Sequence, residues 1–270
     1  MDAIQYAILG LIQGLTEFLP VSSTGHLIVA RELFGFATDH GLAVDAVLQL
    51  ATALAVLVYF FEDILNLIYT GLYKLTGRNV PKEEEKLFWA IIIGTIPAVL
   101  LGLVLESTME TAFRSAHLVA WALIAGSVVF VAAEYFSKKL ESYQTLDRMS
   151  VGQGIVIGLF QCLALVPGMS RSGMTISGGL FLGFTRSDAA RFGFLLSVPI
   201  LFGTGLKKLY DLGADGFLVS SGEGLVIGSV VAFISGLLAI HILMVLVRKT
   251  PLTVFAAYRV ALALAILVYI

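Results

Sequence analysis

Two short polar segments interrupt an otherwise apolar chain and hold most of the residues that could do chemistry. The first, QGLTEFLPVSSTGH, covers residues 13–26 and supplies a carboxylate, several hydroxyls and an imidazole. The second, PGMSRSGMT, covers residues 167–175 and adds further hydroxyls and a guanidinium. Together these groups are suited to phosphoryl transfer, in which catalysis is mainly positioning and charge stabilisation.

The first segment predicts a helix, a break and a second helix. Gln13 and Glu17 lie one turn apart on one face of a helix that we expect to stop at Pro20. His26 follows three residues after Ser23, a spacing that places both side chains on one face of the second helix. The hydroxyls suited to capping that helix are Ser22, Ser23 and Thr24.

The second segment repeats this design. The helix before it is predicted to stop at Val166-Pro167-Gly168, and a new helix then runs through GMTISGGLFL. The residues that open it are Ser170, Arg171 and Ser172. Each segment thus directs a helix N-terminus toward the centre, and such ends bind anions. Because a guanidinium keeps its charge, Arg171 needs a carboxylate or an anionic substrate as its partner.

The rest of the chain predicts an integral membrane protein. Its 270 residues are 58% hydrophobic and 13% charged, whereas soluble domains carry about 25% charged residues. The segments long enough to cross a bilayer are Val44–Phe61, Leu87–Leu105, Leu118–Tyr135, Phe192–Leu206, Leu225–Val247 and Leu252–Ile270. The single cysteine excludes an internal disulfide, and the net charge of −2 gives no indication of a nucleic-acid partner. No basic residue precedes Arg31, so we expect no cleavable signal peptide.

An internal repeat relates the two polar segments. Gln13 corresponds to Gln161 and Gly25 to Gly173, and both pairs are 148 residues apart. We therefore expect one membrane domain of two repeats, residues 1–149 and 150–270. If the six long segments span and each polar segment is a re-entrant hairpin, the loops at 66–86, 137–149, 185–191 and 248–249 share one side and carry eleven of the 17 basic residues.

The positive-inside rule makes that side cytoplasmic. The predicted fold is an all-α polytopic membrane protein, an inverted-topology repeat with about six spanning helices and two re-entrant helical hairpins. The first hairpin would then enter from outside, and the site would open there.

Several interpretations stay open from the residues alone. A secondary transporter or lipid flippase is the alternative function, because inverted repeats with a polar midplane site are a transporter architecture. A Ser-His pair beside an arginine favours hydrolysis. Gln13 could simply hydrogen-bond between helices, and at least one hydroxyl is expected to be a simple cap. Arg259, inside the last span, is unexplained; it could pair with an acidic residue or reach toward the same cavity.

The two segments also resemble the signature motifs of a known family. QGLTEFLPVSSTGH matches a Glu/Gln-x-x-x-Glu element followed by PVSSTGH, and PGMSRSGMT matches PGxSRSxxT, as in the undecaprenyl-diphosphate phosphatases of the BacA type. The resemblance implies a multi-pass enzyme of the bacterial cytoplasmic membrane that removes the terminal phosphate of undecaprenyl diphosphate. The product would be the carrier lipid of peptidoglycan synthesis, and overproduction would bring bacitracin resistance.

The expected site combines the motif residues with their chemistry. We expect catalytic roles for Ser23, His26, Glu17 and Arg171. Substrate-binding roles are expected for Ser22, Thr24, Gly25, Ser170, Ser172, Gly173 and Thr175. Glu17 and Gln13 offer oxygen ligands to a divalent cation, Mg²⁺ or Ca²⁺.

The mechanism we expect begins with attack by Ser23 on the terminal phosphorus, while His26 or Glu17 takes its proton. Attack by His26, or directly by water, stays open. The expected partners are the lipid substrate and the bilayer, and a homodimer stays open.

Overall fold

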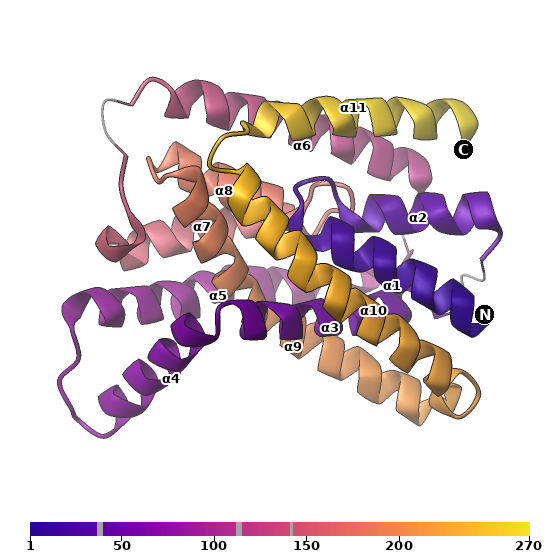
Figure 1. Ribbon diagram of the computed structural model, residues 1–270, viewed down its shortest axis with the longest axis horizontal. Coiled ribbons are helices and arrows are strands. Elements are labelled where there is room, and N and C mark those ends of the chain that lie inside the picture. The colour runs from indigo at the N-terminus through magenta and orange to yellow at the C-terminus, as the bar shows by residue number, and fades with distance from the viewer. Residues whose placement is uncertain (37–39, 112–114, 141–142) are drawn as a thin grey trace.

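The computed structural model describes residues 1–36, 40–111, 115–140 and 143–270. These residues form α-helices, one short 3₁₀ turn (Leu146–Arg148) and a single isolated bridge between Gln144 and Phe184 (Figure 1). The helices are α1 Ala3–Phe18, α2 Ser23–Phe34, α3 Gly41–Tyr59, α4 Phe61–Leu75, α5 Lys82–Thr111, α6 Ala116–Ser137, α7 Val151–Leu163, α8 Arg171–Phe181, α9 Arg186–Ala214, α10 Phe217–Leu246 and α11 Leu252–Tyr269.

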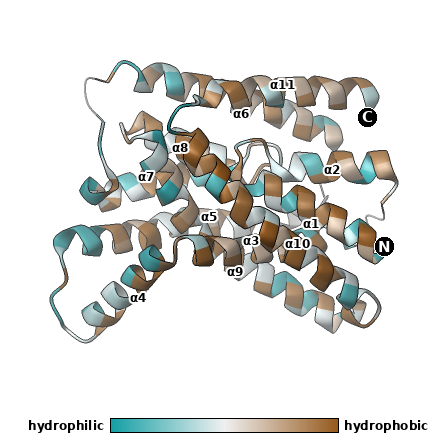
Figure 2. Ribbon diagram, in the orientation of Figure 1, coloured by the Kyte–Doolittle hydropathy of each residue, from teal (hydrophilic) through white to brown (hydrophobic). Residues whose placement is uncertain are grey.

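Six of these helices, α3, α5, α6, α9, α10 and α11, are long and apolar enough to cross a membrane. Each of them overlaps one of the six segments expected from the sequence, so the prediction of an all-α polytopic membrane protein is confirmed. Hydrophobic residues follow most of their length, while hydrophilic residues gather around the α4–α5 turn (Figure 2). Large apolar side chains such as Val104 and Trp121 are more than half exposed, as expected where lipid replaces water.

The two polar segments form helical hairpins, α1–α2 and α7–α8, whose first helices begin alike. The Asp2 side chain accepts from the Gln5 N–H at the start of α1, and the Ser150 side chain accepts from the Gln153 N–H at the start of α7. In each case the glutamine side chain accepts in return from the capping residue's backbone N–H. Helix α1 then ends at Phe18, because Leu19 adopts the extended conformation favoured before a proline.

Glycines bring each hairpin close to a spanning helix of the other half. A Cβ on Gly10 of α1 would lie 2.1 Å from the carbonyl oxygen of Gly228 in α10. A Cβ on Gly158 of α7 would lie 2.0 Å from the carbonyl oxygen of Gly94 in α5. These helices can approach so closely only because the side chains are absent. The two halves of the chain are therefore interleaved.

Two of the loops expected from the sequence are largely helical, and those predictions were wrong. Residues 66–75 continue α4, and α5 already begins at Lys82, with three glutamates in its first turn. Residues 186–191 form the first turns of α9, because Thr185 caps the helix by accepting from the Asp188 N–H at 3.1 Å. In the expected loop at 137–149, residues 141–142 lie outside the described residues. The turn at 248–249 is as expected.

The chain termini mark one end of the bundle. Both termini and the α9–α10 turn lie at the right in Figure 1, whereas α4 and the α4–α5 turn lie at the left. Helix α4, which carries Lys74 in its last turn, and the α4–α5 turn lie at that left end. Helix α4 and the chain termini thus lie at opposite ends of the molecule.

Candidate active site

The site is built on two helix N-termini of matching geometry. Ser22 caps α2 and Ser170 caps α8, and their side chains accept from the N–H groups of Gly25 and Gly173 at 3.3 and 3.4 Å. Both serines have positive φ, 74° and 71°, which costs a non-glycine residue about 1–3 kcal/mol. A Cβ on Gly173 would lie 1.9 Å from the ring of Phe130, so any larger residue here would displace this buried ring.

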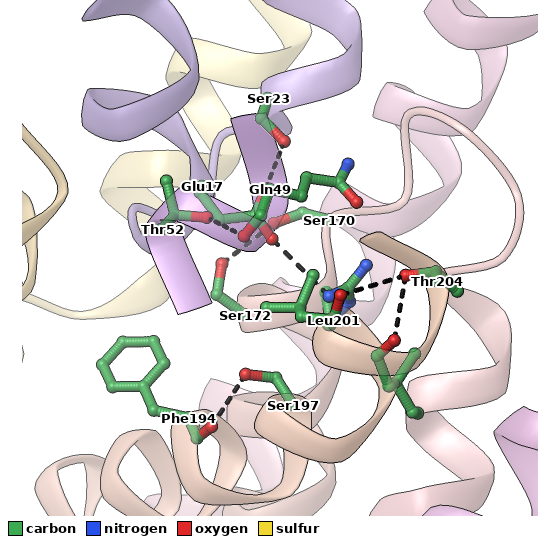
Figure 3. A network of polar contacts seen from close by, with 12 residues as sticks. Glu17, Ser23, Gln49, Thr52, Ser170, Ser172, Phe194, Ser197, Leu201 and Thr204 are labelled. Carbon is green, nitrogen blue, oxygen red and sulfur yellow. Dashed lines mark hydrogen bonds and ion pairs between the residues drawn. The ribbon is translucent and has the colours of Figure 1, made fainter. Parts of the chain in front are cut away.

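Glu17 is the centre of the polar cluster. Its Oε2 accepts from the Ser23 hydroxyl at 2.7 Å and from the Gln13 amide Nε2 at 2.8 Å. Its Oε1 lies 3.7 Å from Nη1 of Arg171. Figure 3 shows Ser23 reaching toward Glu17, with Ser170 and Ser172 beside them. The structure therefore joins residues of both segments around one buried carboxylate.

A small cavity of about 40 Å³, here called the hairpin cavity, opens beside this cluster. Its polar lining comes from helices α1, α2, α3 and α8 and from both hairpin connections: Glu17, Ser22, Ser23, Thr24, Gln49, Ser170 and Arg171. Gln49 belongs to α3 and was not expected from the sequence, where it is one polar residue within a spanning segment. A polar residue inside such a segment is the signal that could have found it.

His26 lies near the cluster but makes different contacts from those expected. Its Nδ1 lies 2.8 Å from the carbonyl oxygen of Ser22, and its Nε2 lies 2.7 Å from the hydroxyl of Tyr258. Because a carbonyl only accepts, Nδ1 carries the proton and Nε2 accepts from Tyr258. The described residues show no hydrogen bond between His26 and Ser23. In this structure Glu17, rather than His26, is the hydrogen-bond partner of Ser23.

Arg259 is fully buried and supports the α7–α8 connection. It donates to the carbonyl oxygens of Gly168 at 2.8 Å, Met169 at 3.0 Å and Leu123 at 3.1 Å. Its guanidinium carbon also lies 4.5 Å from the centre of the Phe130 ring. The two roles expected from the sequence, an acidic partner or a place in the cavity, are both absent among the described residues. Arg259 instead holds the two residues that precede Ser170.

Ser172 and Thr175 link the elements around the cavity without lining it. The Ser172 hydroxyl donates to the carbonyl oxygen of Leu19 at 3.3 Å, which ties the second hairpin to the connection of the first. The Thr175 hydroxyl donates to the Arg171 carbonyl at 3.1 Å, and its side chain packs where Gly193 of α9 leaves space. Both residues therefore position the start of α8.

The donor atoms near Glu17 fit a hard divalent cation. Gln13 donates its amide nitrogen to Glu17, so the atom left buried without a partner is its oxygen Oε1. An amide oxygen and a carboxylate are ligands that Mg²⁺ and Ca²⁺ accept, with further places for water or phosphate oxygens. Groups of three or more histidine, cysteine or acidic side chains able to hold a metal are absent among the described residues. Water or phosphate oxygens would therefore complete the coordination.

The fold and the site together define a class: a polytopic membrane protein whose polar cavity lies between the N-termini of two hairpin helices. Residues 6–265 match the family model described as "Bacitracin resistance protein BacA". The chain is 42% identical over 275 residues to the undecaprenyl-diphosphatase of Chloroherpeton thalassium, covering 99% of this chain and 96% of that relative. The chain belongs to the BacA family.

Two further relatives carry the same name. The undecaprenyl-diphosphatase of Myxococcus xanthus is 42% identical over 270 residues, covering 99% of this chain and 89% of that protein. The undecaprenyl-diphosphatase of Mycolicibacterium smegmatis is 41% identical over 270 residues, covering 99% of this chain and 96% of that protein. Nothing in these comparisons favours the transporter alternative.

Proposed function

We propose that this protein hydrolyses undecaprenyl diphosphate to undecaprenyl phosphate and inorganic phosphate. The observation that carries the proposal is the hydrogen bond of 2.7 Å from the Ser23 hydroxyl to Glu17, with Arg171 at the other carboxylate oxygen. A nucleophile, a base and a fixed positive charge thus meet between two helix N-termini. The names of the three relatives support this substrate.

The proposed first step is attack by Ser23. Arg171 and the N-terminal N–H groups of α2 and α8 hold the diphosphate oxygens. The Ser23 Oγ attacks the terminal phosphorus while Glu17 takes the hydroxyl proton. The bond from that phosphorus to the bridging oxygen breaks, and undecaprenyl phosphate leaves. Water then attacks the phosphorus of the phosphoserine, the bond from phosphorus to Ser23 Oγ breaks, Glu17 returns its proton to Oγ, and the water's protons leave with the inorganic phosphate.

His26 takes a supporting role in this scheme. Both of its ring nitrogens are engaged, by Ser22 and Tyr258, so its orientation is fixed before substrate binds. Attack by His26 would require Nε2 to leave the Tyr258 hydroxyl, and attack by water would leave Ser23 only as a ligand. Phosphate release by the variants Ser23→Ala and His26→Gln separates these routes.

The Glu17 carboxylate and Oε1 of Gln13 would hold a divalent cation, Mg²⁺ or Ca²⁺. When bound, this ion supplies positive charge that stabilises the diphosphate oxygens. The buried, unpartnered Oε1 atom is the observation that supports this role for Gln13. Arg171 lies beside Oε1 of Glu17, so the guanidinium and the cation would both interact with this one carboxylate.

The proposed setting is the bacterial cytoplasmic membrane, with the hairpin cavity open to the outer face. The basic residues at the end of the bundle that holds α4 support this orientation through the positive-inside rule. The equivalent contacts Gly10–Gly228 and Gly158–Gly94 support two inverted repeats, residues 1–149 and 150–270, with re-entrant hairpins. A homodimer is compatible with this arrangement and is tested by the mass of the purified protein in detergent.

Phosphate release from undecaprenyl diphosphate by purified protein in detergent tests the proposal. We expect release from the diphosphate and none from undecaprenyl phosphate, because the monophosphate lacks the anhydride bond. Glu17→Gln provides the matched inactive control. A wild-type preparation that binds the lipid but releases no phosphate, with or without added Mg²⁺ or Ca²⁺, would contradict the proposed activity.

A further inference from the structure

A second and larger cavity lies at the end of the bundle where α6 and α10 finish and α9 begins. Its volume is about 330 Å³, and its polar lining consists of Ser137, Tyr143, Thr185, Arg186, Ser187 and Arg248. We call it the Arg248 cavity. None of these residues lines the hairpin cavity. Leu180 of α8 also lines it, nine residues after Arg171, which is about 14 Å along a helix.

Two arginines line the Arg248 cavity, and one of them carries no ion pair among the described residues. Arg248 is exposed and has no ion-pair partner within the described part of the chain. Arg186 donates through Nε and Nη2 to Glu134 at 2.7 and 2.6 Å, which leaves its Nη1 free. Glu134 is neutralised by this pair and also accepts from the Leu252 N–H at 2.8 Å. Asp188 accepts from the Thr185 hydroxyl at 2.8 Å.

Hydrogen-bond donors in this cavity lack partners. Thr185 caps only the third N–H of α9, so the N–H groups of Arg186 and Ser187 have no acceptor in the helix. Ser137 is 2% exposed and lines the cavity, yet its hydroxyl makes no hydrogen bond to any described residue. A hydroxyl that faces a cavity from an otherwise buried residue needs a ligand or water in that cavity as its partner. The N–H groups at the start of α9 and the Ser137 hydroxyl therefore both point to a ligand with several hydrogen-bond acceptors.

We propose that the Arg248 cavity is a second binding site for a phosphate group, separate from the hairpin cavity. Its two arginines, hydroxyls and helix N-terminus match the several acceptor oxygens of a phosphate dianion. Its volume accommodates a phosphate monoester with part of its substituent. The phosphate belongs either to the headgroup of a lipid monoester at this membrane face or to free inorganic phosphate, since both present the same chemistry.

The test measures binding, so it does not depend on catalysis. The protein used is the variant Arg171→Gln, in which phosphate binding in the hairpin cavity is weakened. This variant is titrated with inorganic phosphate by calorimetry. The same protein is mixed with dioleoyl phosphatidic acid and analysed by native mass spectrometry. We expect binding in at least one arm, with inorganic phosphate alone indicating a soluble ligand and phosphatidic acid alone indicating a lipid headgroup.

Substitutions of residues that line the Arg248 cavity test whether the phosphate binds there. Arg248→Gln should weaken the observed binding about tenfold, because a charge-assisted contact is lost. Ser137→Ala should weaken it by a smaller factor. Lys249→Gln is the matched control, since Lys249 is the exposed next residue and does not line the cavity. Equal weakening by Arg248→Gln and Lys249→Gln, or no binding in either arm, would overturn the proposal.

Discussion

The contact between Ser23 and Glu17 makes the sharpest prediction about the mechanism. If Glu17 takes the proton of Ser23, the two side chains act as one unit. Ser23→Ala should abolish turnover while substrate still binds, because Arg171 and the helix N–H groups remain. Glu17→Gln should lower turnover strongly as well. The double variant Ser23→Ala, Glu17→Gln should be no slower than the slower single variant, since residues that act together are not additive.

The size of the effect follows from the geometry. The Ser23 hydroxyl lies 2.7 Å from Glu17, within the range needed for proton transfer. A positioned general base contributes about 10²–10⁴-fold, or about 3–5 kcal/mol of transition-state stabilisation. We therefore expect Glu17→Gln to lose at least that factor. His26→Gln should lose less, because His26 contacts Ser22 and Tyr258 rather than Ser23.

The assay is phosphate release together with substrate binding and thermal midpoint for each variant. Ser22→Ala is the control, because it removes a capping hydroxyl and should lower stability by about 1 kcal/mol while leaving measurable activity. Robust turnover by Ser23→Ala would refute the covalent mechanism and favour direct attack by water or His26. Independent, multiplying effects of Ser23→Ala and Glu17→Gln would refute the assignment of Glu17 as the base.

Three further predictions concern other parts of the molecule. Arg171→Lys should lose most activity but express normally, because an ammonium lacks the planar fork that grips two phosphate oxygens; near-wild-type turnover would remove Arg171 from the site. Arg259→Met should lower the free energy of unfolding by about 2–4 kcal/mol, since the Gly168 and Met169 carbonyls lose their donor; an unchanged denaturation midpoint would contradict this. With Cys162 replaced, a cysteine at Asn79 should be protected from an impermeant thiol reagent in intact cells and one at Gly213 labelled; the reverse pattern would overturn the orientation.

The features that the sequence predicted correctly depend on local signals. The spanning helices were found because a run of about 20 apolar residues has few alternatives to crossing a bilayer. The break at Pro20 and the capping role of Ser22 follow from restrictions on neighbouring residues. The equivalent capping role of Ser170 follows from the internal repeat. These predictions hold because the cause and the structure lie within a few residues of each other.

The errors arose where stretches between the predicted spanning segments were taken for loops. Helix α4 carries acidic residues in its first turn and Lys74 near its end, which stabilises a helix as well as it suits a loop. The Arg191 side chain pairs with Asp63 of α4, so α9 is fixed by a partner far away in the chain. Basic residues indicate the side of the membrane, but they do not indicate whether the backbone there is helical.

By itself, the sequence determined the membrane class, the spanning helices and the two polar segments, because apolar run length and motif spacing are properties of the chain. Only the tertiary structure decided which side chains meet. It gave Ser23 the carboxylate of Glu17 as its partner and turned His26 toward Tyr258, 232 residues away. It also placed Gln49 in the hairpin cavity and Arg259 against the α7–α8 connection. Spacing along one helix fixes which residues share a face, but the packing of distant helices fixes which of them touch.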